Sequence, residues 1–197
     1  MSHSNTQRLT DYWHRQRGAG LAPLRASVDP TDFADLLPQV FILGRQAAGR
    51  YSFRLSGGLL KDLHGRELRQ ADFIDLWGEA DRIGLQAGME AALRHGRAMV
   101  IDAAGATEEG QDARFEILLA PMISASGQAD RFLGLYQPVS PLQRLRGEAL
   151  ASLSVMQLRP VAQSLPQNLA PLSPGWVEAP RPFPLLRLAA VDGRRTA

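Results

Sequence analysis

The stretch YSFRLSGGLLKDLHGREL, residues 51–68, constrains the fold more than any other part of the chain. Tyr51, Phe53 and Leu55 alternate with polar residues, which is the period of a β-strand with one buried face. A double glycine follows at once, and the apolar spacing then changes to that of a short helix. The chain is therefore expected to leave a sheet abruptly at Gly57 and to place a small helix beside it.

Regular patterns on both sides of this stretch predict further elements. Residues 39–56 have the pattern of a β-hairpin with its turn near residues 47–49. The segment 77–96 has the apolar spacing of an amphipathic helix that ends at Gly96. Three strand-like runs follow, AMVIDAA, ARFEILLAPM and RFLGLYQPV, and turn-forming residues separate them. These runs predict an antiparallel meander.

The two ends of the chain carry apolar stripes at helical spacing. One stripe lies on a helix expected to begin near Ser4 and end near Gly18, and the other on a helix expected over residues 141–158. Two interpretations stay open: the stripes fold back on the chain's own sheet, or they pair with a second copy or a signalling partner. We predict a homodimer through one of these helices. The side chains concerned are Leu9, Tyr12, Trp13, Leu142, Leu145 and Leu153.

Composition excludes several kinds of site. The 197 residues include no cysteine, which excludes disulfides, thiolate metal ligands and cysteine nucleophiles. The net charge is only +2, and the acidic middle of the chain argues against a nucleic-acid partner. No apolar run is long enough for a membrane span, and no hydrophobic signal core is present, so we expect a cytoplasmic protein without a membrane partner.

Candidate chemistry is sparse, and each candidate has a structural explanation. His64 and His95 each precede a glycine at an expected helix end, where a protonated imidazole is favourable. The acidic residues around Trp77 fit the first turn of the following helix better than a catalytic pair. Arg54 and Arg66 either hold an anionic ligand or pair with nearby carboxylates, and both interpretations stay open.

Several separated motifs resemble one family. The motifs are the Asp-Pro helix in VDPTDFADLLPQVFIL, the strand YSFRLSG, the segment LHGREL and the pair of an aromatic residue and a tryptophan that ends at Trp77. In this order they resemble the stand-alone PAS proteins common in alphaproteobacteria, the PAS_5 family. The resemblance covers about residues 8–145 and departs at Arg69 and Gln70, where a small polar residue and glycine are expected.

The resemblance implies an α+β fold, with a five-stranded antiparallel sheet and helices on one face. We expect an N-terminal helical extension over 1–38, a PAS-like domain over 39–140, a helix over 141–158 and a proline-rich, partly disordered tail over 159–197. In this fold the double glycine makes the exit from the sheet, and the small helix after it walls a central cavity. The side chains expected to line that cavity are Phe53, Leu55, Leu60, Phe73, Trp77, Met89, Ile101, Phe115 and Ile117.

The function implied is signal transduction by binding a small molecule, a protein partner or both. A ligand-free interaction module with a collapsed core is the alternative, and a small enzyme is the third interpretation. We expect no catalytic residues, no metal and no haem or flavin, so the pure protein should be colourless. The sequence alone does not name a ligand.

Overall fold

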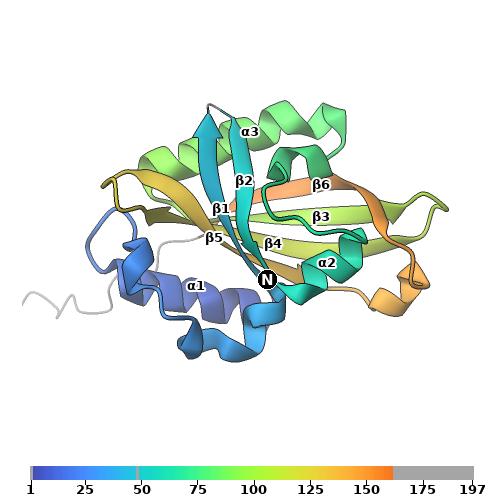
Figure 1. Cartoon of the computed structure of the whole chain (residues 1–197), viewed down its shortest axis with the longest axis horizontal. Coiled ribbons are helices and arrows are strands. Elements are labelled where there is room, and N and C mark those ends of the chain that lie inside the picture. The colour runs from blue at the N-terminus through green and yellow to red at the C-terminus, as the bar shows by residue number, and fades with distance from the viewer. Residues whose placement is uncertain (1, 48, 162–197) are drawn as a thin grey trace, which may run out of the picture. The chain divides into compact units, whose positions relative to one another are not determined.

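A six-stranded antiparallel sheet organises the protein, and helices cover both of its faces (Figure 1). The computed structural model describes residues 2–47 and 49–161. The strand order across the sheet is β2-β1-β5-β4-β3-β6. The strands are β1 (Val40–Ala47), β2 (Arg50–Ser56), β3 (Met99–Thr107), β4 (Asp112–Ile123), β5 (Ala129–Pro138) and β6 (Leu150–Pro160).

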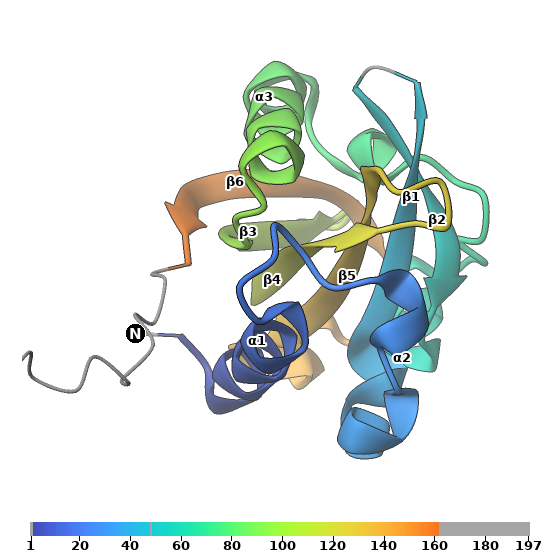
Figure 2. The same cartoon turned by 90° about the vertical axis from the view of Figure 1, so that its left-hand side faces the viewer.

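The helices divide between the two faces of the sheet (Figure 2). The inner face carries Phe115 and Ile117 and is covered by α2, η3 and α3. The outer face carries Leu118 and Ala120 and is covered by α1 and η2. The α-helices are α1 (Ser4–Arg17), α2 (Gly58–His64) and α3 (Glu79–His95). The 3-10 helices are η1 (Arg25–Ser27), η2 (Pro30–Gln39), η3 (Phe73–Leu76) and η4 (Leu142–Leu145).

The predicted hairpin, the helix that ends at Gly96 and the three-stranded meander are confirmed. The Asp-Pro helix is also present, and the Asp29 side chain caps it by accepting the backbone N–H of Thr31 at 2.9 Å. That helix is of the 3-10 type, however, and its Pro38 lies inside it. Local signals of strand alternation and capping were therefore sufficient for these elements.

The N-terminal apolar stripe belongs to the chain's own outer core. Leu9, Tyr12 and Trp13 are all buried against the sheet. The indole N–H of Trp13 donates to the Pro121 oxygen at 2.6 Å, and the Tyr12 hydroxyl accepts the Asp29 N–H at 2.8 Å. These side chains are not available to a partner, so the fold-back interpretation holds for them.

The predicted helix over residues 141–158 is wrong. Four residues form η4, and the chain then continues as β6, the sixth strand of the sheet. Arg146 and Gly147 both have positive φ, at 53° and 84°, and this turn stops the helical path. The leucines of the expected stripe come from two elements, since Leu142 and Leu145 lie in η4 and Leu153 lies in β6.

Two irregularities in the pairing of β6 with β3 decide which face of the sheet each side chain of β6 meets. Between Leu150 and Ser152 one extra residue enters β6, so that Leu150 and Leu153 face the inner core although they are three residues apart. A second shift, at Met156, turns Arg159 to the outer face. Leu145 and Leu153 are buried and Leu142 is half-buried against the same core, so this stripe does not form the predicted dimer seam.

Gly57 makes the exit from the sheet that the double glycine suggested. A Cβ atom at this position would collide with the carbonyl oxygens of Leu37 and Pro38. The Gly57 N–H donates to the Val40 oxygen at 2.9 Å, which fixes the close approach. The glycine is thus required by the passage of one backbone against another, and α2 begins directly after it.

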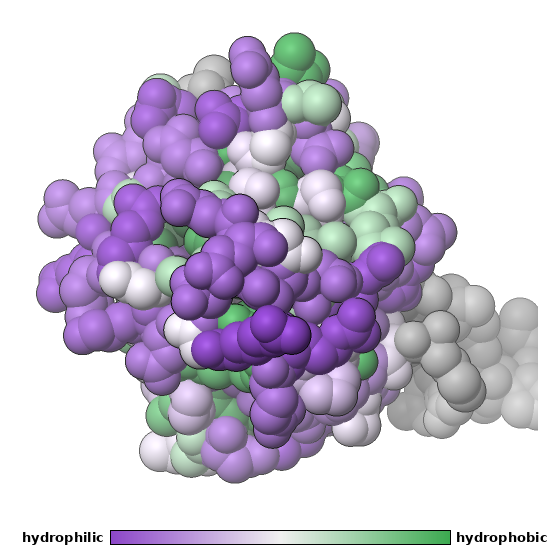
Figure 3. Space-filling view, turned by 90° about the vertical axis from the view of Figure 1, so that its right-hand side faces the viewer, coloured by the Kyte–Doolittle hydropathy of each residue, from purple (hydrophilic) through white to green (hydrophobic). Residues whose placement is uncertain are grey.

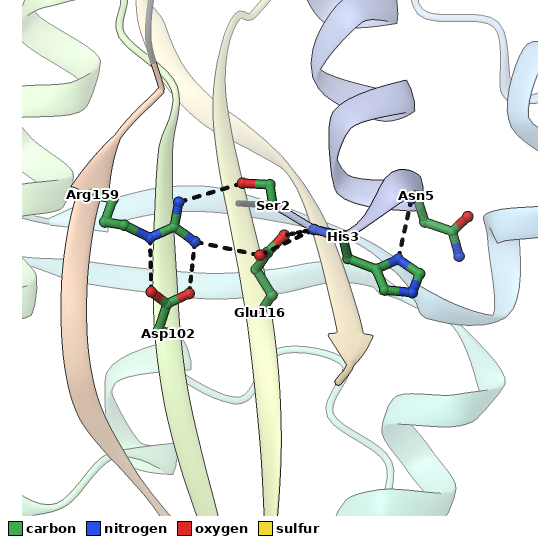
Figure 4. A network of polar contacts seen from close by, with 6 residues as sticks. All are labelled: Ser2, His3, Asn5, Asp102, Glu116 and Arg159. Atoms are coloured by element: carbon green, nitrogen blue, oxygen red, sulfur yellow. Dashed lines mark hydrogen bonds and ion pairs between the residues drawn. The ribbon is translucent and has the colours of Figure 1, made fainter. Parts of the chain in front are cut away.

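A charged network on the outer face ties the start of the chain to its last described strand (Figure 4). The Arg159 guanidinium donates to both carboxylate oxygens of Asp102 at 2.7 Å and to buried Glu116 at 3.3 Å. Glu116 also accepts the backbone N–H of His3 at 3.1 Å, and Arg159 contacts the Ser2 hydroxyl at 3.3 Å. The bidentate geometry of Arg159 with Asp102 makes this pair stronger than an ordinary surface ion pair.

The face that carries the β3–β4 turn and η4 is mainly hydrophilic (Figure 3). Among the described residues no helix has the length and apolarity needed to cross a bilayer. The predicted proline-rich tail lies outside the described residues, apart from its first three positions, two of which end β6.

Two substitutions on β6 distinguish a core strand from an interaction seam. Leu153→Glu would place an unpaired carboxylate in the inner core, and we expect it to lower the free energy of unfolding by about 3 kcal/mol. Met156→Glu, on the same strand but 54% exposed, should change it by less than about 0.5 kcal/mol. Urea unfolding followed by circular dichroism measures both. Equal, small effects of the two variants would contradict the burial of Leu153.

Candidate functional site

The inner core is the candidate binding site. It lies between the inner face of the sheet and the elements α2, η3 and α3, and it contains most of the side chains expected to line a cavity. Eight of the nine expected side chains lie in it and are almost fully buried. These are Phe53, Leu60, Phe73, Trp77, Met89, Ile101, Phe115 and Ile117.

Leu55 is the exception, and its expected place in the cavity is wrong. It is 45% exposed, because the pairing of β1 with β2 shifts by one residue between Ile42 and Leu43. Leu43 pairs with Phe53 and Ile42 pairs with Leu55, which leaves Arg54 as the extra residue of a bulge. The bulge moves Leu55 to the outer face, whereas Phe53 stays inside.

Aromatic rings line much of the inner core. The ring centroids of Phe53 and Phe73 are 5.9 Å apart, and those of Phe73 and Trp77 are 5.7 Å apart, both edge to face. Phe115 and Tyr136 contact each other at 4.9 Å in the same way. Such surroundings favour flat or apolar molecules. They also make the burial of an unpaired polar group destabilising, because little solvent is present to pair with it.

Three polar groups in this region nevertheless have no hydrogen-bond partner among the described residues. They are the imidazole Nε2 of His64, the indole Nε1 of Trp77 and the hydroxyl of Tyr136. Tyr136 and Trp77 are essentially inaccessible, and His64 is 8% exposed. An unpaired buried group costs about 1–3 kcal/mol, so this region can accommodate further hydrogen bonds. Buried side-chain atoms of Thr6, His14, Arg17, Gln39 and Asp130 are also without a hydrogen-bond partner among the described residues.

Tyr51 shows the opposite arrangement at the same depth. Its hydroxyl donates to the Glu90 carboxylate at 2.6 Å, and Arg45 pairs with the same carboxylate at 3.0 Å. Glu90 also accepts the Gly49 N–H at 3.3 Å, so α3 holds the tip of the β1–β2 hairpin. Burial, followed by the bond to Glu90, raises the pKa of Tyr51. This tyrosine has a structural role and its polar group is satisfied.

His64 lies at the end of α2, as the sequence suggested, but its chemistry differs from the expectation. Gly65 takes the left-handed conformation that ends the helix. The imidazole is buried and meets the Tyr136 ring edge to face at 5.8 Å. Burial first, and the charge of Arg66 second, lower the pKa of His64 to about 4. The side chain is therefore neutral at physiological pH, and the explanation as a protonated helix cap is wrong.

The other candidate polar residues lie outside the inner core. His95 is exposed in the last turn of α3. Arg54 is exposed and lies over Gly44, and Arg66 is exposed after α2, so neither points into the core as a pocket residue. Glu67, the carboxylate next to Arg66 in the sequence, pairs with Lys61 at 2.6 Å. In residues 2–47 and 49–161 no cluster of three potential metal ligands occurs.

The sequence reading missed Tyr136. The signal was present, because Phe132, Gly134 and Tyr136 alternate along the run FLGLYQ and share the inner face with Phe115. A tyrosine on such a face brings a hydroxyl into an apolar core. Whether this hydroxyl finds a hydrogen-bond partner, however, depends on residues far away in the chain, and no local pattern indicates it.

A hollow on the outer face is the main rival location. It measures about 580 Å³ and lies beside the network of Asp102, Glu116 and Arg159. Its charged groups, of which Glu116 is buried, already bind one another and the N–H of His3. The inner core is the stronger of these two candidates, because three of its polar groups lack partners, whereas Asp102, Glu116 and Arg159 are paired with one another.

Two tyrosine variants distinguish a satisfied hydroxyl from an unsatisfied one. Tyr51→Phe should lower the free energy of unfolding by about 2 kcal/mol, since it removes a hydrogen bond to a carboxylate. Tyr136→Phe should leave it unchanged or raise it by about 1 kcal/mol in ligand-free protein, since it removes an unpaired polar atom. Urea unfolding midpoints measure both. Equal losses would show that Tyr136 has a partner within the protein.

The buried imidazole predicts a specific acid sensitivity. The pKa of His64 is near 4 in the folded chain and near 6.5 in the unfolded chain, so the unfolded state binds the proton first. Its contribution is fully present above about pH 6.5 and is lost as the pH falls towards 4, by about 3 kcal/mol. His64→Gln should lack this loss in urea unfolding measured from pH 7 to pH 4. Parallel pH profiles of the two proteins would contradict the burial of a neutral imidazole.

Comparison with known proteins adds three kinds of finding. No curated protein matches the chain. Among solved structures, an RNA-binding light-oxygen-voltage receptor is 13% identical, with a TM-score of 0.45, and the match covers 60% of this chain and 35% of that one. The blue-light photoreceptor Aureochrome1 LOV is 12% identical, with a TM-score of 0.43 and coverage of 56% and 82%. A LOV protein of Rhodobacter sphaeroides is 12% identical, with a TM-score of 0.43 and coverage of 60% and 72%.

The family comparison is decisive where these are not. The family model PAS_5, described as a PAS domain, matches residues 1–137, which is more than half of the chain. The matched region contains β1 to β4, nearly all of β5, and every helix that covers the two faces of the sheet. The protein therefore belongs to the PAS_5 family of PAS domains.

Proposed function

We propose that this PAS domain acts as a sensory module that binds a small organic molecule in its inner core. The observation that carries the proposal is the set of three unpaired polar groups, on His64, Trp77 and Tyr136, within an otherwise apolar and aromatic region. Buried polar groups are normally paired, and a bound molecule is one way to pair them. The expected consequence of binding is a change at the surface that a signalling partner reads.

The contacts of Trp77 supply a route from the core to the surface. Trp77 forms a bridge with Leu153 of β6, and the next residue, Gly78, donates its N–H to the Leu153 oxygen at 2.8 Å. Asp81, at the start of α3, accepts the Val155 N–H of the same strand at 2.9 Å. A ligand that moves Trp77 would thus act directly on the edge strand β6 and on its partly exposed side chains.

A ligand-free interaction module is the second candidate, and one observation favours it. The rings of Phe41, Phe53, Phe73 and Trp77 contact one another in series, at centroid distances of 5.6 to 5.9 Å. Direct contact between these rings is what a collapsed core requires. Binding of a small molecule would then require α2 or η3 to move away from the sheet. In α2 only seven residues, Gly58–His64, separate the glycines at its two ends, so this wall has little internal stability.

Freshly purified full-length protein tests the proposal. Native mass spectrometry should show a small molecule at near-stoichiometric occupancy, which denaturing conditions release. The absorption spectrum should lack a Soret band and flavin bands, because we propose no haem or flavin. Unfolding and refolding should remove the molecule and lower the melting temperature, since a ligand stabilises only the folded state that binds it.

The outcomes separate the two candidates. Release of a molecule, together with a lower melting temperature of the refolded protein, supports the sensory module. If nothing is released and the refolded protein melts at the same temperature, the ligand-free interaction module is correct. A stoichiometric Soret or flavin spectrum would keep the sensory role but overturn the expectation of a colourless protein.

A further inference from the structure

The chemistry of the unpaired groups restricts what the inner core can hold. Trp77 offers an N–H that can only donate, and the Tyr136 hydroxyl is an O–H donor that burial keeps protonated by raising its pKa. His64 is neutral, and its buried Nε2 atom has no partner among the described residues. The Trp77 and Tyr136 groups can thus each donate a hydrogen bond to an acceptor on the ligand. The His64 nitrogen can donate or accept one, depending on its tautomer.

Charge restricts the ligand further. Among the described residues the buried side chains of acidic or basic type, apart from His64, are Asp72 and Glu116. Asp72 is already bound by Arg50 at 2.8 Å and accepts the N–H of Ile74 at 3.0 Å. Glu116 lies on the outer face in its own network. A charged ligand in the inner core would therefore find no counter-charge there, and burying it would be unfavourable.

We propose that the inner core binds an uncharged, largely apolar molecule that carries hydrogen-bond acceptors, such as a carbonyl, an ether or an aromatic nitrogen. The acceptors take hydrogen bonds from Tyr136 and Trp77, and the free nitrogen of His64 makes a further polar contact. This inference rests on the proposed sensory function and specifies its ligand class. Carboxylates, phosphates, ammonium ions and pure hydrocarbons are the classes it rejects.

Four probes of similar size test the class: acetophenone, ethylbenzene, benzoate and benzylammonium. We use the full chain, after unfolding and refolding to remove any co-purified molecule, and measure binding by ligand-observed NMR. Acetophenone, the uncharged acceptor, should bind at least about tenfold more tightly than ethylbenzene, which matches its shape but has no acceptor. Benzoate and benzylammonium should show no binding.

Two tyrosine variants locate the polar contact. Tyr136→Phe should weaken the affinity for acetophenone about tenfold and leave the affinity for ethylbenzene unchanged, since it removes a hydrogen-bond donor and almost no side-chain volume. Tyr51→Phe, whose hydroxyl already donates to Glu90, is the matched control and should leave both affinities unchanged.

The indole N–H signals of ¹⁵N-labelled protein give a second readout that needs no variant of Tyr136. Acetophenone should shift the Trp77 signal, which Trp77→Phe assigns. The Trp13 signal should stay in place, since that N–H already donates to the Pro121 oxygen. A shift at Trp77 with none at Trp13 supports direct contact in the inner core.

The outcomes keep this inference apart from the proposed function. If ethylbenzene binds as tightly as acetophenone, or if a charged probe binds best, the ligand class is wrong and the binding function stands. If the freshly purified protein releases a molecule that is charged or lacks acceptors, the class is equally overturned. If none of the four probes binds and the purified protein releases nothing, the proposed function fails and this inference fails with it.

Discussion

The burial of β4 on both faces is the constraint on which the rest of the structure depends. Phe115 and Ile117 face the inner core, and Leu118 and Ala120 face the outer core, all with almost no exposure. A sheet with such a central strand is stable only when both of its faces are covered. The N-terminal helix α1 is therefore part of the fold itself, and its aromatic stripe is used up in covering the outer face (Figure 2). The same requirement explains why α2, η3 and α3 cover the inner face of the sheet.

Strand bulges explain where sequence reasoning succeeded and where it failed. The hairpin, α3 and the meander follow from alternation, caps and turns, which are local and visible. A bulge at Arg54 moves Leu55 out of the expected cavity, and another between Leu150 and Ser152 puts Leu150 and Leu153 on one face of β6 although they are three residues apart. A bulge is specified by the partner strand, since it exists only as a mismatch between two registers. Alternation in a single sequence therefore assigns the residues after a bulge to the wrong face of the sheet.

Tyr51 and Tyr136 show why the candidate site was only partly predictable. Both are fully buried on the inner face, and both occur in clear alternating runs. One hydroxyl meets Glu90, thirty-nine positions away in the chain, and the other meets no partner among the described residues. The apolar lining of a core follows from periodicity, and for this reason eight of the expected side chains are where the pattern placed them. Polar satisfaction depends on individual long-range pairs, which periodicity does not encode.

The last strand gives this PAS domain a feature beyond the matched region. Residues 1–137 carry the family match, whereas β6 spans Leu150–Pro160 and extends the sheet at its β3 edge. Leu153 connects β6 to Trp77 in the inner core, and Arg159 connects it to Glu116 and the start of the chain on the outer face (Figure 4). A single strand thus contacts both cores, because the shift at Met156 directs its two halves to different faces. A displacement that begins at Trp77 cannot move β6 as a rigid strand without straining the pairs of Arg159 with Asp102 and Glu116. The N-terminal segment would therefore be affected by the same displacement, although it lies on the opposite face of the sheet.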